Sequence, residues 1–185
     1  MTEYKLIRSR RKTIGISVDA EGQVIVRAPQ LSTKAQIEKA LRDAEGWIAR
    51  QRARLQAEAK RAEDAGALSE AEIDALAKSM KAALALKLPV FAARAGVTYG
   101  RVTVRCQRSK WGSCSAKGNL NFNCLLMLAP EEVLDYVIVH ELCHRKHMDH
   151  SKEFWAEVER LCPGFKARKK WLKDNGGTLM RRANG

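Results

Sequence analysis

Hydrophobic and polar residues alternate over residues 4–28, with β-branched side chains on either side of the polar segment Asp19–Gly22. Alternation with period two around a short glycine-containing turn is typical of a β-hairpin. Pro29 cannot donate to a strand ladder, so it is expected to end the second strand. The chain is therefore predicted to begin with a hairpin.

Two helices are predicted to follow this hairpin, and each begins with a capping box. The first opens at Thr33, and apolar residues then recur at helical spacing as far as Leu55. The pattern fades into a charged, alanine-rich stretch around Gly66, which is the best candidate for a linker. The second box opens at Ser69, and Pro89 is expected to bend or break that helix.

Two strands are predicted at residues 97–106 and 119–127. The segment between them is polar and contains glycine, which indicates a second hairpin. Pro130 then stands at the first position of a helix that is apolar on almost every face. Such a helix should be buried.

The last part of the chain is predicted to hold two more helices. A break is expected near Met148, and Asp149 or Ser151 is expected to cap the helix that follows. Pro163 and the glycine after it end that helix, and a basic helix covers residues 165–173.

These elements place the chain in the α+β class. A hairpin-and-helix extension is predicted over residues 1–66 and a main domain over residues 67–185, unless both form one compact unit. The length of 185 residues suits one sizeable core with a small appended lobe.

The composition bears on where the protein is located and on the state of its cysteines. No apolar run approaches the roughly 20 residues that span a bilayer, and the N-terminus lacks a signal peptide, so no membrane partner and a cytoplasmic location are expected. The five cysteines form no CxxC pair and are expected to be reduced and mostly buried.

The chain is strongly basic, with a formal net charge of +13. Such a charge attracts anions, including nucleic acid and nucleotides, although a solvated basic surface explains it equally well. Charge alone therefore selects no partner.

The strongest chemical signal is the HExxH sequence from His140 to His144. Residues four apart lie on one face of a helix, so both imidazoles can reach one metal ion, and Glu141 lies near it as a general base. All four histidines of the chain fall between positions 140 and 150, a clustering that favours a metal site over scattered structural histidines.

A catalytic zinc site needs three protein ligands and an open position for water. His150 is the preferred third ligand because an expected helix break would let the chain turn back toward the metal. His147 is the rival, but three ligands on one continuous helix cannot easily surround an ion.

The predicted cofactor is one zinc ion, which suits imidazole ligands and hydrolytic chemistry, while manganese, nickel or cobalt are conceivable substitutes. Glu141 would take the proton of the metal-bound water. The alternative is a closed structural zinc site completed by Cys143 or Cys114, which leaves Glu141 unexplained. Cys143 faces away from the two histidines of the motif and is expected to be a packed thiol.

The sequence HELCHRKHMDHSKEFW, preceded by SKWGSCSAKGNLNFNCLLMLAPEEVLDYVIV, resembles the YgjP-like metallopeptidase family, a WLM-related group similar to SprT-like zinc proteases. The resemblance covers nearly the whole chain. It implies a zincin-like domain in which an HExxH helix lies beside a hairpin, with His140, His144 and His150 as ligands and Glu141 as base. It also implies that Trp111 and Asn123 lie near the active-site cleft; otherwise Trp111 belongs to the core and the following glycine to a turn.

Peptide hydrolysis is the preferred activity, with the strand near residues 119–126 as the edge that receives an extended polypeptide. A nucleoside triphosphate phosphohydrolase is the alternative on the same metal, with Arg105, Arg108 and Lys110 holding phosphates. A third hypothesis is a protein with a structural zinc that binds nucleic acid non-specifically through basic clusters near both ends, over residues 5–12 and 166–170.

Overall fold

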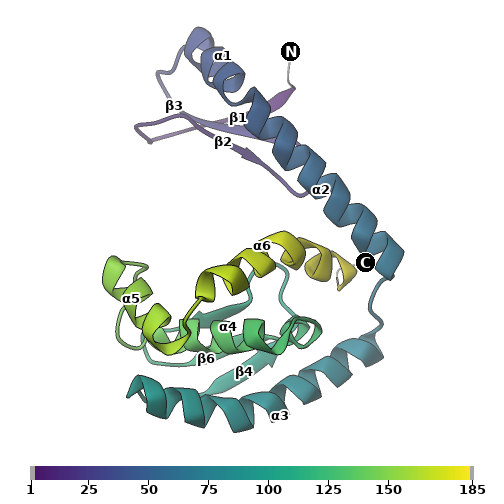
Figure 1. The fold of residues 1–185 in the computed structure, drawn as a ribbon. Helices are drawn as coiled ribbons and strands as arrows, with labels where there is room; N and C mark the ends of the chain where they lie inside the picture. The colour runs from purple at the N-terminus through teal and green to yellow at the C-terminus, as the bar shows by residue number, and fades with distance from the viewer. Residues whose placement is uncertain (1–2, 184–185) are drawn as a thin grey trace. The chain divides into compact units, whose positions relative to one another are not determined.

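The computed structural model describes residues 3–183, as six helices of the α type, one 3-10 helix and six strands (Figure 1). The strands form two separate three-stranded sheets, each of mixed direction. The chain divides into two compact units, Met1–Arg61 and Ala62–Gly185, each with its own hydrophobic core. The predicted α+β class is confirmed, whereas the domain boundary at residue 66 stays a prediction.

The first unit contains β1 (Tyr4–Ser9), β2 (Gly15–Val18) and β3 (Val24–Pro29), in the order β1-β3-β2. The predicted hairpin is formed by the antiparallel strands β2 and β3, and Gly22 takes the positive φ of 83° that the turn requires. β1 pairs with β3 in parallel as a third strand. The strand alternation is therefore right, while the parallel pairing was not foreseen.

Helix α1 (Lys34–Asp43) and helix α2 (Glu45–Ala65) as far as Arg61 complete this unit. The capping box at Thr33 is present. The single long helix expected here is divided at Ala44, where α1 ends. Ile37, Leu41 and Ile48 from the two helices share a core with the buried side chains of β3.

The second unit begins with α3 (Glu70–Ala95), which has the predicted capping box at Ser69. Of the bend or break expected at Pro89, a break is wrong, since the helix continues through this residue. Pro89 is exposed, while Leu84, Leu88 and Ala92 on the opposite side are buried. A proline removes one helical hydrogen bond, and the packed face on both sides of it holds the helix together.

The second sheet consists of β4 (Val102–Arg105), β5 (Gly112–Cys114) and β6 (Leu120–Asn123), in the order β4-β6-β5. β4 and β6 are parallel, so the hairpin predicted from these two segments is wrong. The connection between them is long enough to hold β5, which pairs antiparallel with β6 and forms the real hairpin. The predicted strand at 119–127 is also too long, because the 3-10 helix η1 (Cys124–Leu128) follows β6.

The remaining helices are α4 (Glu131–Cys143), α5 (Lys152–Leu161) and α6 (Phe165–Arg182). α4 contacts α3, α5, α6 and β5, and it is buried as its apolar sequence predicts (Figure 1). Ser151 caps α5 by accepting a hydrogen bond from the backbone of Phe154. α6 continues nine residues past its predicted end at residue 173.

Within residues 3–183, no helix is both long enough and apolar enough to cross a membrane. All five cysteines are free thiols, as expected. Cys124, Cys143 and Cys162 are buried, Cys114 is half-buried and Cys106 is exposed.

Candidate metal centre

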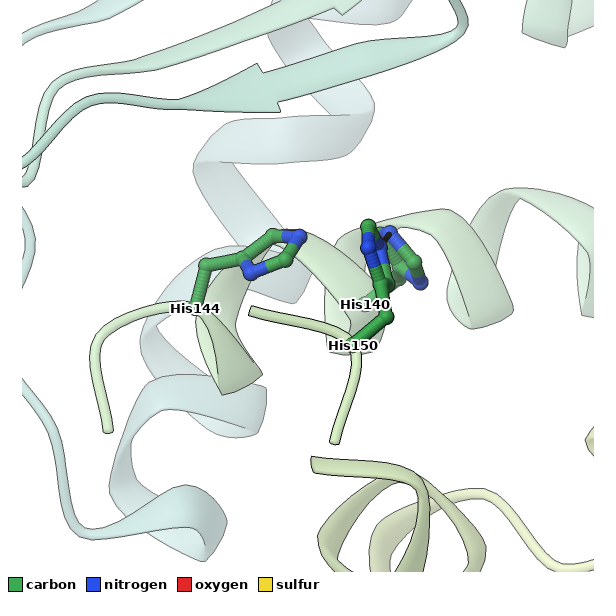
Figure 2. A group of neighbouring side chains, drawn as sticks. All are labelled: His140, His144 and His150. Carbon is green, nitrogen blue, oxygen red and sulfur yellow. Dashed lines mark hydrogen bonds between the residues drawn. The ribbon is translucent and has the colours of Figure 1, made fainter. Parts of the chain in front are cut away.

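Two elements bring three histidines together. His140 lies in the last turn of α4, and His144 lies one turn further on, at the C-terminal end of the helix. His150 comes from the loop that leads into α5 (Figure 2). One ring nitrogen of each histidine lies within 4.8 Å of the corresponding nitrogens of the other two. In the described part of the chain, these three histidines form the group of side chains that could hold a metal ion. The helix break that the sequence predicts therefore returns His150 to the histidines of α4.

The spacing of the imidazoles fits a shared ion. The Nε2 atoms of His140 and His150 lie 3.2 Å apart, as the dashed line in Figure 2 marks. Two nitrogen ligands of a tetrahedral zinc, each at about 2.0–2.1 Å from the metal, are separated by about 3.3–3.4 Å. The pair is thus already at the separation that a common metal would impose.

His144 is oriented by the loop that follows it. Its Nδ1 lies 3.0 Å from the backbone oxygen of His147, which can only accept, so Nδ1 carries the proton and donates it. Nε2 is then the free, unprotonated nitrogen. A hydrogen bond of this kind fixes the tautomer and the ring orientation that a metal ligand needs.

The histidines surround the buried ring of Phe154. This ring stacks on His144 at 4.6 Å and meets His140 and His150 edge-on at 5.0 and 4.9 Å. Burial lowers the pKa of His140 to about 3, with further contributions from the neighbouring histidines and Lys169. Burial likewise lowers the pKa of His144. Neutral imidazole is the form that binds metal, so the environment favours ligation.

Glu141 lies on the inner side of α4 and is only 4% exposed. Burial raises the pKa of its carboxyl to about 8, and the positive charge of Lys110 opposes this shift. Within residues 3–183 no hydrogen bond or ion pair is recorded for this carboxyl. A carboxyl with a raised pKa and no fixed partner can accept a proton and release it again.

Gly112 of β5 faces Glu141 at very close range. A Cβ atom at this position would lie 2.7 Å from Oε1 of Glu141 and 2.8 Å from its Cγ. Gly112 lies within β5 rather than in a turn. The absence of a side chain is therefore what lets the strand approach the carboxyl.

Arg145 holds the β5–β6 hairpin against the end of α4. Its Nε donates to the carbonyl oxygen of Thr98 at 3.0 Å, and its Nη1 donates to that of Ala116 at 3.4 Å. The guanidinium also lies over Gly118, which has a φ of 80° and no room for a Cβ atom. These contacts fix the distance between β5 and α4. The packing of Glu141 against Gly112 depends on that distance.

Asn123, expected near a substrate cleft, is fully buried. Its Nδ2 donates to the carbonyl oxygens of Gln107 and Lys110, both at 2.9 Å, and its Oδ1 accepts from the backbone N–H of Leu125. The amide thus holds the loop that places Lys110 near Glu141.

Trp111 is half-buried and packs against the main core. Its indole lies on Gly176 of α6, where a Cβ atom would come within 2.7 Å of Cζ2. This position agrees with the core interpretation of Trp111.

Comparison with known proteins identifies the family. The family described as "YgjP-like, metallopeptidase domain" matches residues 12–81 and 59–175. This chain belongs to the YgjP-like metallopeptidase family. Among solved structures, the crystal structure of the metallopeptidase zymogen of Pyrococcus abyssi abylysin is similar, with 29% identity over 52% of this chain and 93% of that chain and a TM-score of 0.43. No curated protein matches the chain.

Membership in the YgjP-like family makes this chain part of a metallopeptidase family, which implies a polypeptide substrate. The three histidines supply the group that could hold the metal ion such an enzyme requires. No cysteine joins that group within the described residues. Cys143 is buried in the core, where burial raises the pKa of its thiol to about 12.

The basic residues considered for phosphate binding in this YgjP-like chain differ in their electrostatic effect on Glu141. Arg105, Arg108 and Lys110 are all exposed, and Lys110 is the one whose charge reaches Glu141. In the first unit, Arg8 donates to the carbonyl oxygens of Pro29, Gln30 and Ser32 and so stabilises the chain reversal after β3.

Three residues of the site were missed by sequence reasoning in this family member: Phe154, Trp155 and Lys169. Phe154 and Trp155 follow His150 by four and five residues, and a search for aromatic neighbours of the predicted ligand would have found them. Nothing in the sequence connects Lys169 with the histidines, because the approach of α6 to α5 is a tertiary contact.

Proposed function

We propose that the protein is a zinc-dependent metallopeptidase with a zincin-like site, in which His140, His144 and His150 hold one zinc ion and Glu141 is the general base. The observation that carries the proposal is the convergence of three imidazole nitrogens within 4.8 Å beside a buried glutamate on the same helix. Zinc fits because three neutral imidazoles form a catalytic ligand set that leaves one position open.

His140, His144 and His150 would hold the zinc ion, which would supply a water molecule with a pKa of about 7 and polarise the substrate carbonyl group. Glu141 accepts the proton of the attacking water as the new carbon–oxygen bond forms. It then donates that proton to the amide nitrogen as the peptide bond breaks. His144 keeps its ligating nitrogen free because the carbonyl oxygen of His147 holds the proton on the other nitrogen.

The polypeptide is proposed to bind along β5. The edge expected at residues 119–126 is wrong, since β6 is the central strand and is paired on both sides. β5 is an edge strand, and Gly112 within it faces Glu141. An extended peptide that adds to β5 by backbone hydrogen bonds would run past the general base.

The test is hydrolysis of an unfolded polypeptide such as β-casein by zinc-loaded protein. Glu141→Gln removes the base and keeps the size of the side chain, so it should retain one zinc per chain and lose at least about 100-fold in rate. Full activity of this variant would contradict the assigned role of Glu141. Absence of bound zinc in the wild-type protein would overturn the metal site itself.

A nucleoside triphosphate offered in place of β-casein tests the phosphohydrolase alternative. The exposed Lys110 near Glu141 is the observation that favours an anionic substrate. Turnover of the triphosphate that disappears in Glu141→Gln, together with no cleavage of β-casein, would replace the peptidase proposal with this alternative.

A further inference from the structure

Two of the cysteines stand opposite each other at the ends of neighbouring strands. The parallel strands β4 and β6 are paired as far as Arg105 and Asn123, and Cys106 and Cys124 follow these partners by one residue each. Adjacent strands of a sheet lie about 4.8 Å apart. A disulfide needs Cα atoms that are about 4.4–6.8 Å apart. The backbone positions of Cys106 and Cys124 therefore suit a disulfide bond.

The side chains of the two cysteines point to the same side of the sheet. Side chains alternate along a strand, so Cys106 follows the direction of Val104 and Cys124 that of Phe122. Val104 and Phe122 are register partners, and both belong to the packing of the main core. A side-chain hydrogen bond joins the thiols of Cys106 and Cys124. The strand register and the side chains thus both bring the two sulfur atoms into contact.

The two thiols differ in their access to solvent. Cys106 is exposed, whereas Cys124 is fully buried in the core. Burial and the neighbouring Cys106 raise the pKa of Cys124 to about 11. The thiolate is the form that reacts with an oxidant, and solvent access decides which thiol the oxidant reaches. A dissolved oxidant should therefore react first with Cys106 and leave Cys124 to attack second.

The remaining cysteines do not offer such a pair. Cys143 and Cys162 are both buried, so a dissolved oxidant does not reach them. Cys114 is half-buried, and its thiol donates to a backbone carbonyl oxygen at 3.4 Å. Oxidation should therefore select Cys106 and Cys124.

The segment that begins at Cys106 is fastened to the residue before Cys124. Asn123 donates from Nδ2 to the carbonyl oxygens of Gln107 and Lys110, both at 2.9 Å. These hydrogen bonds hold both ends of the segment 107–110 against the end of β6. A change in the spacing of the two cysteines would therefore act on this segment.

The same segment leads directly into the candidate metal centre. It enters β5 at Gly112, which packs against Glu141. An S–S bond is about 2.05 Å long, much shorter than the contact between two thiols. Because Cys124 is held in the core, formation of this bond would draw Cys106 and the segment that follows it inward.

We propose that Cys106 and Cys124 are a redox-sensitive pair, which a hydroperoxide converts into a disulfide that slows hydrolysis at the metal centre. The effect on hydrolysis rests on the proposed function, whereas the disulfide itself does not. The Cys106 thiolate attacks one peroxide oxygen, the O–O bond breaks, and a sulfenic acid forms on Cys106. Cys124 then gives up its proton and attacks the sulfur of Cys106, which releases the sulfenic oxygen as water. With hydrogen peroxide, two thiols and one peroxide give one disulfide and two water molecules.

The experiment treats zinc-loaded, full-length protein with hydrogen peroxide. Trypsin cuts after lysine and arginine, so the proposed disulfide would join the peptides 106–108 and 118–145. Mass spectrometry of the unreduced digest should detect these two peptides as one species. A phosphine reductant should separate them again.

Three variants assign the disulfide to its two sulfur atoms. Cys106→Ser and Cys124→Ala should each abolish the linked species. Loss of the link in Cys124→Ala excludes Cys143, which lies in the same peptide. Cys114→Ser lacks a thiol outside the pair and should form the linked species as the wild type does.

Hydrolysis of β-casein is then measured before and after oxidation of each protein. Oxidised wild type and oxidised Cys114→Ser should each lose about 10-fold in rate, less than the 100-fold cost of a misplacement of about 1 Å at the catalytic group itself. The reductant should restore the rate. Cys106→Ser should keep the rate that it has before treatment.

Conversion of Cys106 to a sulfinic or sulfonic acid, with no link to Cys124, would overturn the pair. A disulfide that leaves the rate unchanged would overturn its effect on hydrolysis. Cys106 is exposed, so Cys106→Ser should fold and decides the test even if Cys124→Ala does not fold. Reduced wild-type protein that does not cleave β-casein would refute the proposed function, while the linked peptides still decide on the disulfide, so the two failures are distinguishable.

Discussion

The three histidines have different surroundings at the residue scale. His144 donates from Nδ1 to the carbonyl oxygen of His147, whereas the buried Nδ1 of His140 has no hydrogen-bond partner among residues 3–183. His150 is exposed. A metal ion would hold the rings of His140 and His150 in place, while the ring of His144 is already held by the protein. The site is therefore only partly preorganised by the chain itself.

His144 donates its hydrogen bond to the backbone carbonyl oxygen of His147, so the imidazole of His147 should be dispensable for metal binding. We expect His147→Ala to retain zinc affinity within about threefold, because its carbonyl oxygen remains. His150→Ala removes a proposed ligand and should weaken zinc binding far more than the 10- to 100-fold typical of lost outer contacts. Competition with a zinc chelator measures the zinc affinity of both variants. A larger loss of affinity in His147→Ala than in His150→Ala would make His147 the third ligand.

Gly112 packs directly against Glu141 and leaves no room for a Cβ atom. We expect Gly112→Ala to lower kcat by about 100-fold with zinc still bound, because a misplacement of about 1 Å at a catalytic group costs that much. Gly46→Ala, at an exposed position of α2 where a Cβ atom would meet only the flexible Arg50 side chain at 3.4 Å, should leave activity unchanged. An active Gly112→Ala enzyme would mean that β5 can retreat without disturbing Glu141.

At the element scale, a charged cluster joins the turn after α4 to α5. Glu157 accepts from Lys146 at 2.7 Å and from Arg160 at 2.9 Å, and its side chain is 14% exposed. Hydrogen bonds from Arg160 and Lys146 lower the pKa of Glu157 from 4.5 to about 2. Because His150 lies on the loop between these helices, the cluster stabilises the segment that carries a proposed ligand.

The lowered pKa of Glu157 predicts a dependence of stability on pH. The unfolded chain binds the proton more tightly than the folded chain, so the contribution of Glu157 is present above pH 4.5 and is lost as the pH falls toward 2. Glu157→Gln should lower the free energy of unfolding by about 1–2 kcal/mol at neutral pH and by less under acid conditions. Urea unfolding of metal-free protein measures this difference, with Glu153→Gln on the same helix as control. A difference that does not change with pH would show that packing rather than charge is lost.

At the scale of the whole molecule, local signals predicted local structure well. The capping boxes at Thr33 and Ser69, the cap at Ser151 and the breaks around α5 depend on a few neighbouring residues, and the structure contains them. HExxH placed two histidines on one helical face for the same reason.

What the sequence could not predict depends on residues far apart in the chain. The parallel pairing of β4 with β6, which makes β5 the edge strand, is one such feature, because a short apolar segment does not specify its partner. The approach of Lys169 to Trp155 is another. The continuation of α3 through Pro89 also reflects tertiary packing that overrides a local preference.

The two units have separate cores, and this leads to a prediction about independent folding. Val24, Val26 and Ile37 belong to the first core, whereas the second consists of residues from α3 onward. All three histidines and Glu141 lie in the second unit. We therefore expect a fragment of residues 62–185 to fold cooperatively and to bind one zinc ion with the affinity of the full chain.

Circular dichroism and chelator competition on the fragment and the full-length protein measure these two properties. Zinc binds the folded state only, so it should raise the Tm of the fragment, and the rise should increase with zinc concentration. His150→Ala in the fragment should abolish that rise and serves as the control for non-specific binding. A fragment that stays unfolded with zinc present would mean that residues 1–61 contribute to the stability of the metal-binding unit, and the proposed division of the chain would then be wrong.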